Sequence, residues 1–471
     1  MFFDDNLLLY SKTAKTLYEK VRDLPIIDYH CHLDQRKIAE NATFADIGEL
    51  WLAGDHYKWR AMRMNGVDEH FITGKASYYE KFMKYAEILP NLIGNPLYYW
   101  THLELKHLFD IDIPLNIDTA ENIYAMANEK LKSMTVRDML NIFGVKFIAT
   151  TDDPVDDLLN HQKYGEINVT PTFRPDKLFD FDESYILKLQ DVVGFSINNL
   201  DDLLKALVSR LDYFVEKGCR MADHGMDRFP AKYATEDEAK KLFENRKNLS
   251  NDDKECLKGF LLVWLSKEYA KRNMSVQLHI AVTRNVNPDT FALCGVDSGF
   301  DVISEMPTVQ NVLGFFAQIK DNERPHTILY TLNDANLSSL ACLTGAFRNV
   351  KMGAAWWFND TVEGIRRNLK IISEYSSLGG NLGMLTDSRS FSSYVRFDFF
   401  RRIICDYVGN LVEKGEYDPL NAEILVKNIC YYNAKRMDGS RTRACNYNSK
   451  CCNNNLLERS PNQYYRHTGP R

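Results

Sequence analysis

The chain has 471 residues, of which 45% are hydrophobic and 26% are charged, so it can bury a large core and has the composition of an ordinary globular protein. Its formal net charge of −6 argues against nucleic acid or an anionic membrane as the main partner. No stretch is apolar for long enough to span a membrane, and the acidic start does not fit a signal peptide, so we expect a cytoplasmic protein.

The first elements predicted along the chain are a short helix within residues 5–22 and a strand at residues 25–32. The strand ends in the sequence Asp-Tyr-His-Cys-His-Leu, and the alternation of an extended chain places His30 and His32 on the same side. Two imidazoles on one side of a strand can share a metal ion. Two unrelated surface histidines are the alternative interpretation.

A long region of helical periodicity follows, from residue 34 to about residue 140. It contains no strand-like run. We therefore predict a large helical insertion after the first strand, which forms a cap over the ends of the strands.

Seven further strand-like runs alternate with helical patterns, at residues 145–151, 167–173, 219–222, 276–280, 327–331, 350–355 and 382–386. Eight alternating strands predict a (β/α)₈ barrel, whose active site lies at the carboxyl ends of the strands. A doubly wound open sheet is disfavoured, because no strand is followed by a Gly-x-Gly-x-x-Gly or Walker loop.

The barrel is expected to form a single domain over residues 1–436. Residues 437–471 lose all apolar periodicity and predict a disordered or non-native tail. Three of the ten cysteines, Cys445, Cys451 and Cys452, cluster in this tail without the paired spacing of a zinc knuckle. The other seven stand singly, as is typical of reduced thiols.

Asp387 is the predicted partner of the histidine pair. It follows the eighth strand, which in a closed barrel is the neighbour of the first. Two imidazoles and one carboxylate leave coordination positions open, so the set suits one divalent ion, with Zn²⁺ favoured. A helix N-cap is the alternative role for Asp387.

Arginines follow three of the predicted strands, at Arg174, Arg284 and Arg389. A guanidinium group binds a carboxylate through two parallel hydrogen bonds, so these arginines indicate an anionic substrate, although each by itself fits a surface ion pair. Trp356 or Trp357 offers a planar apolar wall, and a core position is the alternative for one of the two.

Further candidates lie in the insertion and in the middle of the chain. His56 and Tyr57 stand side by side at the start of the cap, where either can act as an acid or a base. Asp223, counted as substrate-binding, orients neighbouring groups or simply ends its strand. His279 is interpreted as either a further metal ligand or a core histidine.

With these residues in view, the chain resembles the uronate isomerases, also called glucuronate isomerases, a divergent branch of the amidohydrolase superfamily. The resemblance extends to about residue 436, and its most specific motifs are Asp-Tyr-His-Cys-His-Leu (28–33), Gly-Asp-His-Tyr-Lys-Trp-Arg (54–60), Thr-Phe-Arg-Pro-Asp (172–176), Ala-Trp-Trp-Phe (355–358) and Leu-Thr-Asp-Ser-Arg-Ser (385–390).

The resemblance implies reversible isomerisation of D-glucuronate to D-fructuronate, and of D-galacturonate to D-tagaturonate, through an enediol. It also implies His30, His32 and Asp387 as metal ligands, and it places Tyr57, Arg174, Arg284, Trp356 and Arg389 around the substrate. The expected partner is thus a small hexuronate, with pairing into a homo-oligomer compatible with a barrel. The alternatives are a metal-dependent amidohydrolase or lactonase on the same barrel, and a non-catalytic carbohydrate-binding protein.

Overall fold

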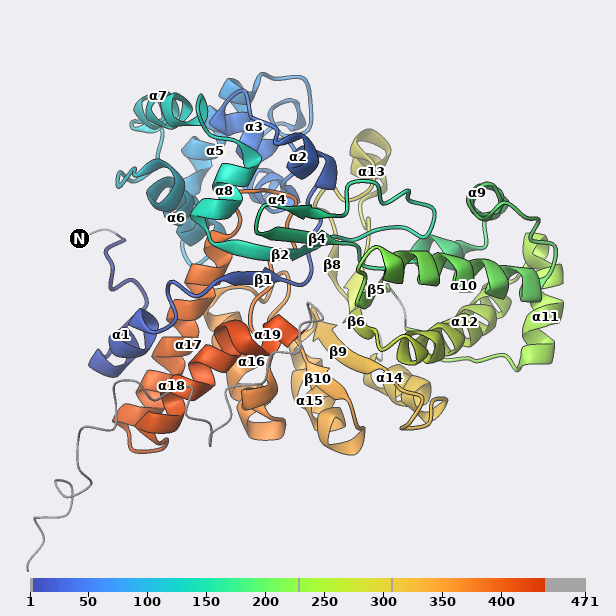
Figure 1. The fold of residues 1–471 in the computed structure, drawn as a ribbon. Coiled ribbons are helices and arrows are strands. Elements are labelled where there is room, and N and C mark those ends of the chain that lie inside the picture. Colours follow the sequence, from blue (N-terminus) through green and yellow to red (C-terminus); the bar gives the residue numbers. More distant parts are fainter. Residues whose placement is uncertain (1–2, 228, 306–307, 437–471) are drawn as a thin grey trace, which may run out of the picture.

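The computed structural model describes residues 3–227, 229–305 and 308–436, and Figure 1 shows its fold. The predicted tail and its three cysteines lie outside the described residues. The seven cysteines of the described part are free thiols, as the sequence predicted. Within these ranges, no helix has both the length and the apolar character needed to cross a membrane.

Two sheets of mainly parallel strands form the centre of the protein. The first contains, in spatial order, β1 (Ile26–Asp28), β2 (Val145–Ala149) and β4 (Ile167–Thr170), with the short β3 (Lys163–Tyr164) antiparallel at its edge. The second is parallel throughout, in the order β10 (Val350–Met352), β9 (His326–Thr331), β6 (Ser275–Ile280) and β5 (Met221–Gly225). A small antiparallel pair, β7 (Val282–Thr283) and β8 (Val302–Ile303), follows β6.

The prediction of an α/β protein with parallel strands is confirmed, and seven of the eight predicted strands are present. Four of them end earlier than predicted. The first strand stops at Asp28, so His30 and His32 lie in the loop that follows it, not in the strand itself. All six residues of β6 are buried, as expected for a parallel sheet covered by helices on its outer side.

The predicted eighth strand at residues 382–386 is wrong, because this segment forms no ladder with a neighbouring strand in the described part of the chain. Positive φ angles at Gly383 (+72°) and Asp387 (+46°) interrupt its extended path. The backbone N–H of Thr386 donates to the Asp28 carboxylate (3.0 Å). This N–H is therefore bonded to a side chain, where in a β-ladder it would bond to a backbone carbonyl of the neighbouring strand. The segment nevertheless lies beside the chain after β1, since the N–H of Asp387 donates to the carbonyl of His30 (3.1 Å).

The two sheets are linked at one point. Phe173, just beyond β4, forms isolated parallel bridges to Asp152 on one side and to Ala222 of β5 on the other. The parallel strands thus follow one another from β1 to β10, with residues 386–388 beside β1.

Between β1 and β2 the regular elements of the described chain are all helices. The helices are α2 (Gln35–Glu40), α3 (Ile47–Leu52), α4 (His56–Met64), η1 (Glu69–Phe71), α5 (Tyr78–Ile88), η2 (Leu89–Asn91), α6 (Pro96–Phe109), α7 (Ala120–Leu131) and α8 (Val136–Ile142). Polar side chains cap the starts of most of them; Asp55, for example, accepts the N–H groups of the first turn of α4. Figure 1 shows this insertion as one body beside β1 and β2.

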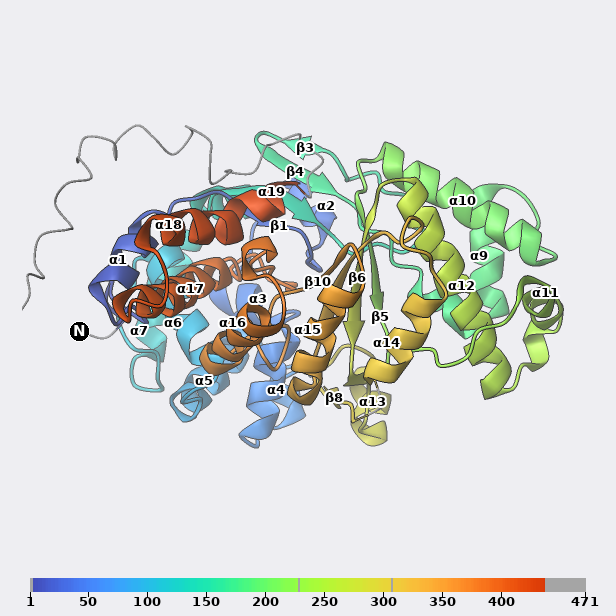
Figure 2. The same ribbon diagram turned by 90° about the horizontal axis from the view of Figure 1, so that it is seen from below.

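The remaining helices connect the strands and surround the sheets (Figures 1 and 2). They are α1 (Lys12–Glu19), η3 (Asp176–Asp180), α9 (Glu183–Val193), α10 (Leu200–Glu216), α11 (Glu236–Glu244), η4 (Arg246–Asn248), α12 (Asn251–Lys271), α13 (Pro288–Cys294), α14 (Thr308–Ala317), η5 (Asp334–Asn336), α15 (Leu337–Ala346), α16 (Val362–Tyr375), η6 (Leu378–Gly380), α17 (Val395–Glu413), α18 (Pro419–Lys427), η7 (Asn428–Tyr432) and α19 (Asn433–Lys435). The N-terminal helix α1 packs on the long, largely buried α17.

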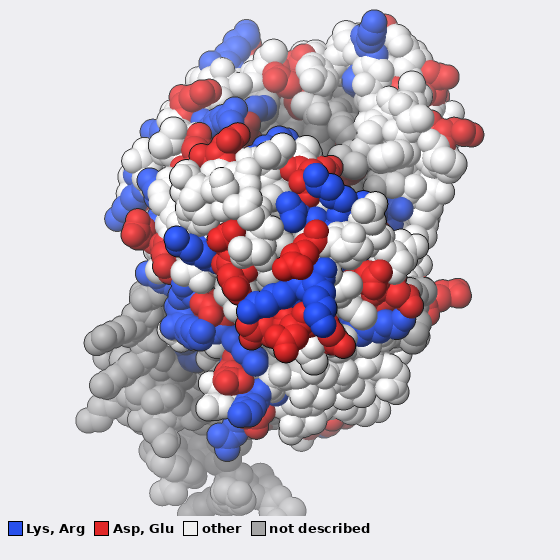
Figure 3. Space-filling view, turned by 90° about the vertical axis from the view of Figure 1, so that its right-hand side faces the viewer, with Lys and Arg blue, Asp and Glu red and all other residues white. Residues whose placement is uncertain are grey.

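The face formed by α9 to α12 carries charges of both signs (Figure 3). Oppositely charged side chains form ion pairs there, such as Lys240 with Glu236 (3.1 Å) and with Asp201 (3.3 Å). Exposed pairs of this kind contribute little to stability, and they give this face a mixed charge.

Candidate active site

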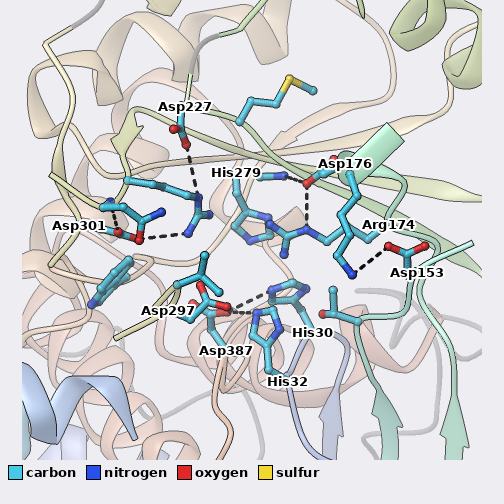
Figure 4. Close-up of a pocket in the computed structure, with 18 of the residues that line it drawn as sticks. His30, His32, Asp153, Arg174, Asp176, Asp227, His279, Asp297, Asp301 and Asp387 are labelled. Atoms are coloured by element: carbon cyan, nitrogen blue, oxygen red, sulfur yellow. Dashed lines mark hydrogen bonds and ion pairs between the residues drawn. The ribbon is translucent and has the colours of Figure 1, made fainter. Parts of the chain in front are cut away.

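A cavity of about 760 Å³ opens at the carboxyl ends of the parallel strands (Figure 4). The side chains that line it follow or end several strands that are far apart in the sequence. They include His30 and His32 after β1, Asp152 and Asp153 after β2, Arg174 after β4, His279 in β6, Arg284 after β7, Trp356 after β10, and Asp387. The insertion contributes His56 from the first turn of α4.

His30, His32 and Asp387 converge at the base of this cavity (Figure 4). The Nε2 atom of His30 lies 3.2 Å from Asp387 Oδ1, and the Nε2 atom of His32 lies 3.1 Å from the same oxygen. Burial alone would raise the pKa of Asp387, but hydrogen bonds from the two imidazoles hold it well below its usual range. The carboxylate is therefore ionised at neutral pH.

The donor set fits a divalent metal ion. One ligand atom from each of the three residues lies within 4.8 Å of the others. Ligands at the usual Zn–N and Zn–O bond lengths lie about 3.4 Å apart in a tetrahedron, close to the separations seen between both imidazoles and the carboxylate oxygen. Burial lowers the pKa of His32 to about 4, so this imidazole is neutral above that pH, and in the tautomer with its proton on Nδ1 it offers the Nε2 lone pair to a metal ion.

Asp223 lies beneath these histidines and is fully buried. Its carboxylate contacts the Nδ1 atom of His279 (2.7 Å) and a terminal nitrogen of Arg174 (3.0 Å), and it lies 3.9 Å from the Nδ1 atom of His30. Burial would raise the pKa of Asp223, yet the Arg174 guanidinium and the neighbouring imidazoles hold it well below its usual range. Asp223 is an anion that orients three cavity groups from below and does not itself line the cavity.

Arg174 and Arg284 converge on Gly225, at the end of β5. A Cβ atom at Gly225 would lie 2.1 Å from one Arg174 nitrogen and 3.2 Å from an Arg284 nitrogen, so glycine allows both guanidinium groups to approach. Asp176 accepts from Arg174 Nε (2.9 Å) and from the N–H of Gly225 (2.8 Å), which fixes the direction of the arginine. Two cations held side by side in a cavity favour an anion between them.

Arg389 lies between the insertion and the strand ends. One terminal nitrogen lies 2.9 Å from His56 Nδ1, and the other lies 2.9 Å from Asp297 Oδ2. Because arginine can only donate, Nδ1 of His56 must accept, and the remaining proton of the neutral ring is on Nε2. Burial and the Arg389 charge lower the pKa of His56 to about 4, which keeps the ring neutral.

The predicted aromatic candidates are placed differently from one another. Trp356 lines the cavity, and its indole N–H donates to Asp387 Oδ2 (2.7 Å), so it also orients that carboxylate. Tyr57 is buried outside the cavity lining and donates its hydroxyl to Asp360 (2.9 Å). Burial and the Asp360 charge raise the pKa of Tyr57 well above its usual value.

Comparison with known proteins gives one consistent result. The sequence profile described as glucuronate isomerase matches residues 1–437. A uronate isomerase from Geobacillus thermodenitrificans is 43% identical, over 92% of this chain and 98% of that relative. The chain belongs to the glucuronate isomerase family.

Solved structures agree with the assignment to glucuronate isomerases. The crystal structure of uronate isomerase from Thermotoga maritima superposes with a TM-score of 0.90 at 34% identity, over 93% of this chain and 99% of that one. A putative metal-dependent hydrolase from Lactobacillus casei shares the fold alone, with a TM-score of 0.55 at 12% identity, over 90% of this chain and 97% of the other. The family resemblance stated from the sequence motifs is confirmed.

For this glucuronate isomerase family member, the structure brings nine of the ten site candidates to the cavity or directly beneath it. Tyr57 is the one that lies apart, behind His56. Sequence reasoning gave no role to Asp176, Asp297 and Asp301, which hold the three arginines. Asp176 stood within a quoted motif, and the Gly-x-Asp-x-Gly-x-Asp spacing of residues 295–301 was the signal available for the other two.

Proposed function

We propose that this protein interconverts D-glucuronate and D-fructuronate, and D-galacturonate and D-tagaturonate, as an aldose–ketose isomerase. The observation that carries the proposal is the pair of guanidinium groups at Gly225, which lie in the same cavity as the cluster of two histidines and one aspartate. A hexuronate has a carboxylate at one end and a carbonyl carbon at the other. The cavity thus offers a place for each end.

The carboxylate of the substrate is assigned to Arg174 and Arg284. Arg174 is oriented by Asp176 and Asp223, and Arg284 is held by Asp301 (3.1 Å). Because each guanidinium keeps further N–H groups beyond these contacts, both can donate to a bound anion. Trp356 supplies an apolar surface against which the carbon chain of the sugar can pack.

His30, His32 and Asp387 are assigned as the ligands of one divalent ion, with Zn²⁺ favoured by the two nitrogens and one carboxylate oxygen. When bound, such an ion acts as a Lewis acid toward a substrate oxygen. Asp387, which is ionised, is assigned the removal of a hydroxyl proton when the sugar ring opens.

Isomerisation then moves one proton from C2 to C1 and the hydroxyl proton from O2 to O1, so that the aldehyde at C1 becomes a ketone at C2 through an enediol. Negative charge develops on the oxygens during this transfer. Arg389 and the Nε2–H of His56 are the cavity donors assigned to stabilise it. Tyr57 supports this arrangement from behind, because its hydroxyl contacts Asp360 and its ring packs near His56.

We also propose that the sheets form a single barrel domain over residues 1–436, with the helical insertion of residues 34–140 as its cap. The contacts of residues 386–388 with the chain after β1 support closure at that side.

The test is to incubate the purified protein with D-glucuronate carrying deuterium at C2 and to follow both ketose formation and the label. The enediol route predicts ketose formation, a slower reaction of the labelled substrate, and loss of part of the label to water. Complete transfer of deuterium to C1 without exchange would contradict the enediol route. Hydrolysis of amides or lactones without any ketose formation would favour the alternative hydrolase function, which no contact in the described cavity specifically supports.

A further inference from the structure

A short segment between α13 and β8, residues 295–301, enters the cavity and carries two carboxylates (Figure 4). Asp297 Oδ2 lies 2.9 Å from a terminal nitrogen of Arg389. Asp301 Oδ2 lies 3.1 Å from a terminal nitrogen of Arg284. One segment therefore contacts the arginine assigned to the reacting oxygens and one of the two assigned to the substrate carboxylate.

The backbone of this segment has a specific path. Asp297 adopts a left-handed conformation (φ +58°), between Gly295 (φ +76°) and Gly299 (φ +94°). A Cβ atom at Gly299 would lie 2.8 Å from the carbonyl oxygen of His56, so the segment packs directly on the first residue of α4. A left-handed non-glycine residue costs free energy, and such residues concentrate at functional sites.

Two arginines of α4 anchor the segment from the insertion. Arg60 donates to the carbonyl oxygens of Gly299 and Asp301, each at 3.0 Å, and its guanidinium lies 4.7 Å from the centre of the Phe358 ring. Arg63 donates to the carbonyl of Ser298. The segment is thus tied to the same helix that supplies His56.

The charges explain why carboxylates are needed here. Arg284 and Arg389 line one cavity, and unpaired cations of this kind repel one another and sample many rotamers. The Asp297 side chain is half-exposed; its partial burial would raise its pKa, but Arg389 and Arg284 hold the pKa below its usual range. An ionised Asp297 fixes one nitrogen of Arg389 while His56 fixes the other, which leaves the guanidinium with a single orientation.

We propose that Asp297 and Asp301 are positioning residues of the isomerase, acting through Arg389 and Arg284 respectively. This inference rests on the proposed function. Asp297 aligns the arginine that faces the developing negative charge, so its loss lowers kcat. Asp301 aligns the arginine that binds the substrate carboxylate, so its loss raises KM.

The experiment compares Asp297→Asn and Asp301→Asn with Asp289→Asn, an exposed aspartate on the neighbouring helix α13. We expect kcat for D-glucuronate to fall about 10- to 100-fold in Asp297→Asn with KM changed less than threefold. In Asp301→Asn we expect KM to rise about tenfold with kcat nearly kept, while Asp289→Asn matches the wild type. Asp297→Glu, which keeps the charge, should recover most of the lost kcat.

A binding measurement separates a positioning role from a merely structural one. L-Gulonate, the alcohol formed when the aldehyde of D-glucuronate is reduced, keeps the carboxylate and cannot be isomerised. Calorimetry should show that Asp301→Asn binds L-gulonate about tenfold more weakly than the wild type. In protein that already carries Arg284→Gln, adding Asp301→Asn should weaken L-gulonate binding by less than a further twofold. Equal losses in both backgrounds would overturn the role of Asp301.

The whole proposal would be overturned if kcat and KM of both Asp297→Asn and Asp301→Asn stayed within threefold of the values for Asp289→Asn. A wild-type protein that forms no ketose would instead refute the proposed function. The calorimetric comparison would still decide whether Asp301 acts through Arg284, so the two failures are distinguishable.

Discussion

Replacing Gly225 with alanine would place a methyl group where two guanidinium groups converge. The new Cβ atom would lie 2.1 Å from an Arg174 nitrogen, so that nitrogen must move by more than about 1 Å to reach ordinary contact distance. Arg174 cannot move this far and keep its contacts with Asp176 (2.9 Å) and Asp223 (3.0 Å). A displacement of about 1 Å in a substrate-positioning group costs up to roughly 100-fold in rate.

We therefore expect kcat/KM of Gly225→Ala for D-glucuronate to fall about 100-fold, mainly through KM, with little change in melting temperature because the clash is with a side-chain end. Steady-state kinetics and thermal unfolding measure both. The matched control is Gly345→Ala in α15, where a Cβ atom would meet nothing within 4 Å. If Gly225→Ala keeps kcat/KM within threefold of the control, the assignment of Arg174 to the substrate carboxylate is refuted.

Three further predictions concern the metal, acid stability and a buried ion pair. Asp387→Asn should bind less than a tenth of the Zn²⁺ bound by the wild type, measured by elemental analysis, and should lose roughly a thousandfold in kcat/KM; retention of both would refute the ligand assignment. Burial lowers the pKa of His102 from 6.5 to about 4, so the free energy of unfolding should fall as pH drops from 6.5 toward 4. His102→Gln should reduce this fall by up to about 3 kcal/mol in urea titrations, and an unchanged slope would contradict it. Lys58→Met should destabilise the fold by about 3–5 kcal/mol, because it removes the ammonium group that lies 2.8 Å from the buried Asp55 carboxylate and 3.9 Å from that of Glu104. A melting temperature equal to that of the wild type would show that these ion pairs do not stabilise the fold.

The strands were predictable because their residues are locally unambiguous. Short β-branched and apolar runs bounded by helical patterns identify buried parallel strands, as in β6, where every residue is buried. The segment 382–386 has the same apolar character, yet it forms no ladder, because Asp28 takes the Thr386 N–H that a neighbouring strand would bind. Such competition between a side chain and a backbone partner 358 residues apart leaves no local pattern.

The same distinction applies to the site. The His-x-His pair, Asp387 and the arginines after strands were visible as residue types at strand ends, and His56 was visible beside Tyr57. The sequence did not show that the two members of this pair point in different directions. The first turn of α4 directs His56 into the cavity and Tyr57 toward Asp360. Side-chain direction on a helix depends on what the helix packs against, which the sequence does not state.

The sequence by itself determined the alternation of strands and helices, the residue types of the site and the family, because these depend on local propensity and on motifs that are contiguous in the chain. Only the tertiary structure decided which groups work together. Gly225 serves Arg174 and Arg284, and Asp297 pairs with Arg389, through contacts between segments distant in sequence. Such contacts are set by how the elements pack, and no periodicity along the chain encodes them.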